Sequence, residues 1–536
     1  MYRALVLGII AFYFLVVFLV SWYTTRGIER DALSFYRGDR KSPWWVVAIA
    51  MVGTSITGVT YISVPGMVGE SQMAYLQMAL GFWAGYFVIA FVLLPLYYRL
   101  NLTSIYVWLE QRYGTYAHIT GTAFFLLSKF LSCSVRMYLT ATVLLVVLFP
   151  HAQADSSLFT LHSSLIMMFI VWLYSFKGGV KTLVWIDMLQ TLCLVCGMVG
   201  IVACVSYAMG LDAGALYRTI TDSDMSRIWF FDDVNSKHYF WKQFLGGMFV
   251  TIAMTGLDQD MMQKNLSCKT LHDAQKNMVT YGFCFIPVNF IFLALGILLY
   301  TYAGTLGMTG QDGRSLHSLT GTTLKADELF PYLATAVNPI SGQNVLPLAV
   351  TVLFVIGLIA AAFSSVGSAV TSLTTAVMVD FRAHNRFVVH LLNCVLVGVG
   401  MYVFHIVGSG SVINAIYVIV SYTYGPLLGM FFLGLLTNVH PRRSLIPLAC
   451  VASPLICYIL DTNSEVWFGG YKMGYELLIV NGLITALLLT IGSIGNKKNC
   501  LTENQTVLYL IIVTISMYIY VTHAQVMYFI QLLLFA

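Results

Sequence analysis

The chain has 536 residues, of which 59% are hydrophobic and 10% charged, and its net charge is +5. A soluble domain cannot bury that much apolar surface, so the composition excludes an ordinary globular protein and predicts one embedded in a lipid bilayer. The small positive charge reflects membrane topology, and no nucleic-acid partner is expected. Most of the ten Cys residues lie in apolar segments, which predicts no disulfide framework.

Apolar segments of roughly 20 residues recur along the whole chain, and we predict an all-α membrane protein with about 14 transmembrane helices. No low-complexity tract or linker separates these segments, so residues 1–536 are expected to form a single domain. In chain order, the predicted spans are 4–23, 44–66, 73–98, 115–149, 157–176, 182–209, 241–262, 278–304, 345–380, 387–408, 411–436, 444–461, 471–494 and 506–535.

The distribution of Lys and Arg predicts which side of the membrane is cytoplasmic. When the spans alternate in direction, most of these residues fall on one side, in a group that runs from Arg26 through Lys264 to Lys498. That side is expected to be inside, which places both termini outside. The first span lacks a small-residue cleavage site and is interpreted as a retained helix. All three N-x-S/T sequons fall on the predicted inside, which favours a bacterial inner membrane.

The second predicted span carries an interruption, MVGTSITGVTYISVPG (51–66), where glycines and hydroxyl residues cluster within the membrane. Such residues weaken a helix and expose backbone carbonyls, which is tolerable only where the chain lines a cavity. The seventh span has a similar weak point at AMTGLDQDMM (253–262). Matched breaks five spans apart predict an inverted-repeat transporter with its site at the membrane midplane. Ordinary glycine-softened helices would explain each break separately.

The inverted-repeat interpretation divides the domain into four parts. Residues 1–43 would form an extra N-terminal helix and a cytoplasmic loop, 44–209 the first repeat, 241–436 the second repeat and 444–536 three C-terminal helices. Between spans eight and nine, ADELFPYLATAV (326–337) is amphipathic enough to predict a short surface helix over an outer vestibule.

A stripe of small and hydroxyl residues runs along the ninth span. Successive helical residues turn by about 100°, so one face collects Ala361, Ser364, Ser365, Ser368 and Ser372. A hydroxyl face within a membrane contacts protein, water or an ion. Adjacent hydroxyls beside an approachable backbone suit a hard cation such as Na⁺, which prefers oxygen ligands. Close packing of helices through small residues is the alternative.

Ionisable residues within the spans need partners or functions, because a charge at a helix centre costs about 2.5–3.5 kcal/mol. Lys129, paired or solvated, lies seven residues before Arg136 on the same helix face. The planar fork of Arg136 suits a carboxylate, either an acid within the membrane or an anionic substrate. Asp187 is expected to pair with a Lys or to hold a cation or proton. Asp258 and Asp260 are interpreted as solvated residues at a cytoplasmic helix end.

Four segments resemble motifs of the sodium/solute symporter family, which includes sodium–sugar, sodium–proline, sodium–iodide and sodium–sialic acid carriers. These segments are SFYRGDRKSPWW (34–45), KGGVKTLVWIDMLQ (177–190), LDQDMMQKNLSCKT (257–270) and YTYGPLLGMFFLGLLT (422–437). The serine run of span nine resembles the family pattern as well. The resemblance implies the LeuT-type fold, an inverted repeat of five helices, and sodium-coupled import of a small organic solute by alternating access.

The resemblance also implies a sodium site with five oxygen ligands: the carbonyls of Gly53, Ile56 and Ala361 and the hydroxyls of Ser364 and Ser365. Some family members hold a second sodium ion, for which Asp187 and Ser368 are the corresponding residues. This chain departs from the fuller second site at Gly367, where those members carry a side-chain oxygen. A ratio of one sodium ion per solute is therefore expected.

By the same resemblance, the solute-binding residues are Ser55, Thr57, Thr60, Gln77 and Arg136. The sialic acid branch uses a similar set that includes an Arg, whereas the sodium–galactose branch has a Glu where this chain offers Gln77. A carboxylate such as an acidic sugar is therefore favoured over a neutral hexose. The expected partners are the solute, the sodium ion and membrane lipid, and one chain is expected to suffice for transport.

No enzymatic motif such as HExxH, GxSxG or a phosphate loop is present, and His390 and His405 are interpreted as packed side chains. Two alternatives to a sodium symporter remain at this point. A proton-coupled carrier of the same fold, for a neutral sugar or amino acid, would rely on Asp187. A membrane sensor or receptor would need a soluble output domain, and the connections are short. Tyr417 and Tyr422 are candidates for the aromatic residue of an inner gate.

Overall fold

The computed structural model describes residues 2–25, 40, 42–102, 104–148, 157–176, 179–310, 315–319, 321–336, 344–407 and 412–494. Within these residues, eight helices are long and apolar enough to cross a membrane, or nine if one bent pair counts as a single span. The protein is therefore a multi-pass helical membrane protein. The last predicted span, 506–535, and most of the loop that follows the first span lie outside the described residues.

The described elements of the first part of the chain, as far as Ala208, are all helices. Its elements are α1 (Tyr2–Thr25), α3 (Trp44–Ser55), α4 (Gly58–Gly66), α5 (Val68–Ser71), α6 (Tyr75–Val88), the π-helical turn η2 (Ile89–Leu93), α7 (Leu94–Arg99), α8 (Val107–Tyr113), α9 (Thr115–Leu148), α10 (Ser157–Ser175) and α11 (Gly179–Ala208).

The second part adds a two-stranded antiparallel hairpin between long helices. Its elements are α12 (Ala213–Thr221), the 3-10 turn η3 (Asp224–Ser226), α13 (Phe240–Thr251), the π-helical turn η4 (Ile252–Gly256), α14 (Gln259–Asn265), α15 (Leu271–Thr305), β1 (Leu316–His317), β2 (Thr323–Leu324), α16 (Ala326–Thr335), α17 (Leu348–Asp380), α18 (Arg386–Val407), α19 (Val412–Leu436), α20 (Leu445–Thr462), α21 (Ser464–Trp467) and α22 (Leu477–Ile491). The surface helix predicted at 326–337 is confirmed as α16.

The predicted interruption of the second span is confirmed. Helix α3 ends at Ser55, α4 begins at Gly58, and the two axes bend by 60°. The two residues between them, Ile56 and Thr57, are extended, and the Thr57 hydroxyl caps α4 by accepting the N–H of Thr60 at 3.4 Å. A helix end leaves its last carbonyls without intrahelical partners, so the break presents backbone oxygens inside the protein.

The seventh span is also interrupted where the sequence predicts a weak point. Helix α13 passes into the π-helical turn η4, and the chain leaves helical geometry at Leu257 and Asp258 before α14 begins. The Asp258 carboxylate caps α14 by accepting the N–H of Asp260 at 2.8 Å. Both predicted interruptions are thus present in the described part of the chain, and each break is stabilised by a side chain at the start of the following helix.

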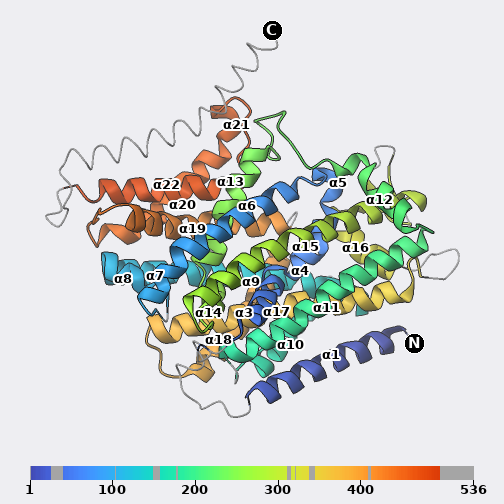
Figure 1. Ribbon diagram of the computed structural model, residues 1–536, viewed down its shortest axis with the longest axis horizontal. Helices are drawn as coiled ribbons and strands as arrows, with labels where there is room; N and C mark the ends of the chain where they lie inside the picture. Colours follow the sequence, from blue (N-terminus) through green and yellow to red (C-terminus); the bar gives the residue numbers. More distant parts are fainter. Residues whose placement is uncertain are drawn as a thin grey trace, which may run out of the picture.

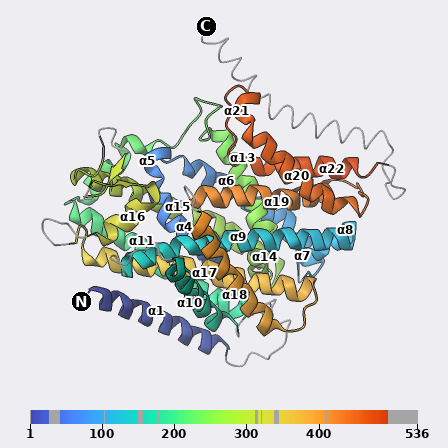
Figure 2. The ribbon, with the colours of Figure 1, turned by 180° about the vertical axis from the view of Figure 1, so that it is seen from behind.

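Helix α17 forms the centre of the molecule. It packs against α3, α4, α9, α11 and α18, and every residue from 357 to 376 is buried. Figures 1 and 2 show α1 at one edge of the helical bundle and α20 and α22 at the opposite edge, with α3, α9, α14 and α17 between them. The hydroxyl stripe of the ninth predicted span therefore faces protein on all sides rather than lipid.

Candidate functional site

The two breaks meet around a cavity of about 110 Å³ in the middle of the bundle. The first break and the start of α4 contribute Ser55, Thr57 and Thr60 to its lining, and α9 contributes Arg136. Aromatic side chains from α6, α15 and α19 complete the wall; they are Tyr75, Phe82, Tyr86, Phe285, Tyr417 and Tyr424. Four of the five predicted solute-binding residues thus line one cavity, which combines apolar walls with a few polar groups.

Arg136 is half-buried and makes no ion pair with any acid in the described part of the chain. Its Nε atom is buried without a hydrogen-bond partner among these residues. The sequence allowed either an acid within the membrane or an anionic substrate as the partner of Arg136. No described acid takes that role, so its guanidinium is free to bind an anion in the cavity.

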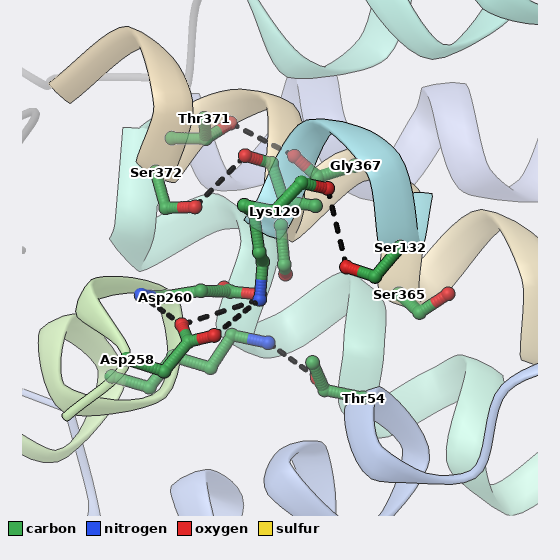
Figure 3. A network of polar contacts seen from close by, with 12 residues as sticks. Thr54, Lys129, Ser132, Asp258, Asp260, Ser365, Gly367, Thr371 and Ser372 are labelled. Atoms are coloured by element: carbon green, nitrogen blue, oxygen red, sulfur yellow. Dashed lines mark hydrogen bonds and ion pairs between the residues drawn. The ribbon is translucent and has the colours of Figure 1, made fainter. Parts of the chain in front are cut away.

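Lys129 lines the same cavity together with its two acidic partners, Asp258 and Asp260. Its ammonium lies 3.0 Å from the Asp258 carboxylate and 2.8 Å from that of Asp260, and the Tyr424 hydroxyl donates to Asp258 at 2.6 Å. Figure 3 shows the Lys129 side chain pointing between the two acids. The interpretation of these acids as solvated is wrong: they are 2% and 3% exposed, because the break in the seventh span turns both toward α9.

A pair of tyrosines separates the central cavity from a larger one of about 640 Å³. Tyr417 lines both cavities, and its hydroxyl bonds to that of Tyr75 at 3.2 Å. Its ring packs on Tyr475 with centroids 4.5 Å apart. The larger cavity is bordered by Lys237, α16 and the 473–475 segment, all on the predicted outside. On the predicted topology Tyr417 lies near the outer end of α19, which favours a position at an outer gate over the inner gate for which it was a candidate.

Gln77 does not reach the central cavity. Its amide donates to the carbonyl of His238 at 3.0 Å and accepts the N–H of Phe230 at 3.1 Å, so both ends of the side chain hold the 222–239 connection. Burial and, second, the charge of Lys237 lower the pKa of His238, which keeps the imidazole neutral at pH 7. The structure thus gives Gln77 an anchoring position rather than a place beside the other four predicted residues.

The residues of the predicted sodium site lie where α3 ends against α17. Gly53 and Ile56 belong to the end of α3, where carbonyls lack intrahelical partners. A Cβ atom at Gly53 would overlap the hydroxyl of Thr191 on α11, so only glycine permits this packing. On the other side of the break, α4 also packs against α17, and a Cβ atom added at Gly58 would lie 3.5 Å from that of Ala362. The break therefore faces the 361–365 segment of α17.

The hydroxyls of Ser364 and Ser365 each donate their hydrogen to another oxygen of the protein. Ser364 donates to a carboxylate oxygen of Asp187 at 3.0 Å, and Ser365 donates to the carbonyl of Ala362 at 3.1 Å. Each oxygen keeps acceptor capacity for a cation. Together with the backbone carbonyls of Gly53, Ile56 and Ala361, these hydroxyls are the predicted oxygen ligands of a hard monovalent cation.

Asp187 organises a buried cluster next to this position. Its carboxylate accepts the hydroxyls of Ser364 and Ser368, the latter at 2.8 Å, and lies 2.6 Å from the ammonium of Lys264. Lys264 also donates to the Thr54 hydroxyl. The sequence left open whether Asp187 pairs with a Lys or holds a cation, and the structure shows the Lys.

The partner of Asp187 was missed at the sequence level. Lys264 was assigned to the cytoplasmic charges, yet it is 2% exposed. The sequence signal that could have pointed to Lys264 is Asp187, because a carboxylate inside an apolar span requires a cationic partner. The break in the seventh span then brings a lysine of α14 within reach of α11. His390, in contrast, is packed as expected, between the hydroxyls of Ser175 and Thr374.

Interrupted helices around a central polar cavity, in a multi-pass helical membrane protein, define the class of secondary transporters. The chain belongs to the sodium:solute symporter family, whose model matches residues 35–439. The family resemblance stated from the sequence motifs is thereby confirmed. Members of this family are transporters, in agreement with the prediction of a carrier rather than an enzyme.

Known relatives of this chain are carriers of several solutes. It is 25% identical over 413 residues to the sodium-dependent multivitamin transporter of Oryctolagus cuniculus, covering 74% of this chain and 60% of that protein. It is 26% identical over 416 residues to sodium-coupled monocarboxylate transporter 2 of Danio rerio, covering 75% and 62%. It is 21% identical over 501 residues to the sodium/sialic acid symporter SiaT of Proteus mirabilis (strain HI4320), covering 89% and 93%.

Solved structures support the same fold. A substrate-bound, outward-open Na⁺-coupled sialic acid symporter superposes with a TM-score of 0.70 at 17% identity, over 91% of this chain and 97% of that one. A nucleobase-cation-symport-1 family transporter in a closed conformation gives a TM-score of 0.51 at 13% identity, over 85% and 92%. The match to the two animal carriers named above spans about three fifths of their length.

Proposed function

We propose that this protein is a sodium-coupled symporter that imports a small organic carboxylate by alternating access. The observation that carries the proposal is Arg136, a guanidinium without an acidic partner in the described chain, at the wall of a central cavity. A cation in a partly desolvated cavity binds a carboxylate through charge-assisted, bidentate hydrogen bonds. The other charged residues of the cavity lining, Lys129, Asp258 and Asp260, already form ion pairs with one another.

The sodium ion would bind between the first break and α17. Its ligands in this proposal are the carbonyls of Gly53, Ile56 and Ala361 and the hydroxyls of Ser364 and Ser365. The support for this assignment is the free helix-end carbonyls of α3 and the donor directions of the two serines. Sodium is a transported partner here and leaves with each cycle.

Coupling between ion and solute follows from the position of the break. The same short segment carries proposed sodium ligands, Gly53 and Ile56, and the cavity residues Ser55, Thr57 and Thr60. An ion that orders this segment also orders the hydroxyls that contact the solute, and the effect is reciprocal by thermodynamic linkage. Loss of sodium to a low-sodium cytoplasm would then weaken solute binding and release it inside.

The proposal includes the wider architecture. We assign about 14 spans with both termini outside, two inverted repeats at 44–209 and 241–436, and a bacterial inner membrane location. The matched breaks at 56–57 and 252–258 support the repeat assignment. An acidic sugar and a shorter monocarboxylate are the solutes to compare, and a single chain is expected to be sufficient.

The proton-coupled alternative is less favoured by the structure. It would need Asp187 as the proton carrier, but this carboxylate is ion-paired with Lys264 and accepts two serine hydroxyls. Sodium-dependent uptake into proteoliposomes separates the two mechanisms, because a proton-coupled carrier would respond to a pH gradient and ignore external sodium.

The solute class is tested with labelled sialic acid, pyruvate, lactate and acetate in the same vesicles. Replacing Arg136 with Ala should raise the KM of the transported carboxylate at least tenfold, about 1.4 kcal/mol, because a charge-assisted contact is lost. Arg136→Lys retains the positive charge but not the planar guanidinium, so its KM should lie between those of the wild type and Arg136→Ala. An unchanged KM in Arg136→Ala would exclude the carboxylate assignment while leaving sodium coupling intact.

A further inference from the structure

The cluster around Asp187 is already complete in charge and in hydrogen bonds. One carboxylate oxygen accepts Ser364 at 3.0 Å, and the other accepts Ser368 at 2.8 Å and the ammonium of Lys264 at 2.6 Å. The side chains of Lys264 and Asp187 are 3% and 1% exposed. One negative and one positive charge cancel, so the cluster has no electrostatic need for another cation.

The space beside this cluster is closed as well. Gly367 lies one residue before Ser368, and a Cβ atom at Gly367 would overlap the hydroxyl of Tyr174 and approach two of its ring carbons to 3.0 Å. The Tyr174 hydroxyl is held there by donating to the carbonyl of Phe363 at 2.7 Å. A side-chain oxygen at position 367, as a further cation ligand, therefore cannot be accommodated next to this tyrosine.

We propose that the Lys264 ammonium acts as a built-in cation that takes the place of a second sodium ion beside Asp187. This inference rests on the proposed function, because it concerns the number of sodium ions in the same transport cycle. The protein then binds a single sodium ion, at the position between the first break and α17, and Asp187 and Ser368 hold a lysine rather than a transported ion.

The lysine also connects the two interrupted helices. Lys264 belongs to α14, directly after the break in the seventh span, and it donates to Thr54, the residue after Gly53 at the end of α3. A free ion at this place would bind and leave with sodium concentration, whereas a covalently attached ammonium stays. The pair therefore holds the two breaks together at every sodium concentration.

The proposal is tested by binding of ²²Na⁺ to the purified full-length protein, which requires no knowledge of the solute. In the proposal Ser365 is a ligand of the first position alone, since its hydroxyl donates to Ala362 and not to Asp187. If one ion binds, Ser365→Ala should weaken it at least tenfold, so that ²²Na⁺ binding measured at the wild-type Kd falls about fivefold. Retention of about half the capacity in Ser365→Ala would overturn the proposal, because a second site would remain.

A second set of variants tests the lysine directly. Lys264→Gln leaves the Asp187 carboxylate buried and uncompensated, so it should recruit an ion and raise the sodium capacity about twofold. Lys264→Arg retains the charge and should bind as the wild type does. The double variant D187N/K264Q removes both charges and should also keep the wild-type capacity. Wild-type capacity in a folded Lys264→Gln protein would overturn the proposal.

The outcomes separate this inference from the proposed function. If the wild type shows no saturable sodium binding, sodium coupling itself fails and the inference falls with it. If the wild type binds sodium and Ser365→Ala keeps half of that capacity, symport stands and the role of Lys264 is wrong. Should Lys264→Gln fail to fold, the Ser365→Ala measurement still decides.

Discussion

At the residue scale, the direction in which a buried hydroxyl donates determines whether its oxygen remains available to a cation. Ser364 and Ser365 are adjacent on α17, yet one donates across to α11 and the other back to its own helix. Their oxygens can both accept, which is the property that a sodium site needs. Two of the three carbonyls that complete the proposed site, those of Gly53 and Ile56, come from the end of α3, and the third, that of Ala361, lies within α17.

Replacing Ser365 with Ala should raise the sodium concentration for half-maximal uptake at least tenfold, about 1.4 kcal/mol, because one ligand of a small hard cation is lost. Uptake into proteoliposomes over a range of external sodium measures this. Ser372→Ala is the matched control, since Ser372 is equally buried on the same helix and donates to its own backbone at 2.8 Å. Unaltered sodium dependence in Ser365→Ala would contradict the proposed ligand set.

Gly367 provides a prediction about packing. Gly367→Ala forces a methyl group against the Tyr174 ring and should lower the free energy of unfolding by about 1–3 kcal/mol. Thermal unfolding of the detergent-solubilised protein checks it. Gly8→Ala is the control, because nothing lies within 4 Å of a Cβ there and alanine favours a helix. Equal melting temperatures for the two variants would show that Tyr174 moves aside at no cost.

At the element scale, the interrupted helices were predictable and their partners were not. The glycines and hydroxyls of 51–66 weaken the helix locally, so the sequence alone indicates the break. The pairing of Lys264 with Asp187 depends on the packing of α14 against α11, across 77 residues. The position of Tyr417 likewise required the structure, since sequence identifies an aromatic residue on α19 but not the cavities on either side of it.

The contact between α9 and α14 depends on a single lysine. Lys129→Met removes the only cation that forms ion pairs with Asp258 and Asp260 within the described chain. It should destabilise the fold by about 3–5 kcal/mol, because two buried carboxylates are left without a cation. Loss of monodisperse protein in size-exclusion chromatography is the expected readout. Lys129→Arg keeps the charge and should remain folded. A well-folded Lys129→Met protein would indicate that the acids are neutralised in another way.

At the scale of the whole molecule, the balance of transported charge decides how voltage acts. Each charge that crosses a membrane gains about 2.3 kcal/mol per 100 mV. One sodium ion and one monovalent carboxylate carry no net charge, so their combined transport gains nothing from the potential. Accumulation would then depend on the sodium gradient alone.

Uptake of a monocarboxylate should therefore be unchanged when an inside-negative potential is imposed on the proteoliposomes with potassium and valinomycin. Equal potassium on both sides of the membrane gives the control without a potential. A steady inward current during uptake of a monoanionic solute would mean that more than one sodium ion accompanies it, in conflict with both the closed space beside Gly367 and the lysine at Asp187.

The close contact between Gly53 and Thr191 has a consequence for ion preference. Thr191 belongs to α11 and is fixed by donating to the main-chain oxygen of Asp187 at 2.6 Å, so it limits how far the end of α3 can retreat from α17. In the proposed site, the radius open to an ion is thus set by a side chain that never touches that ion. Substitutions of Thr191 should accordingly change the preference among lithium, sodium and potassium while every proposed ligand stays in place.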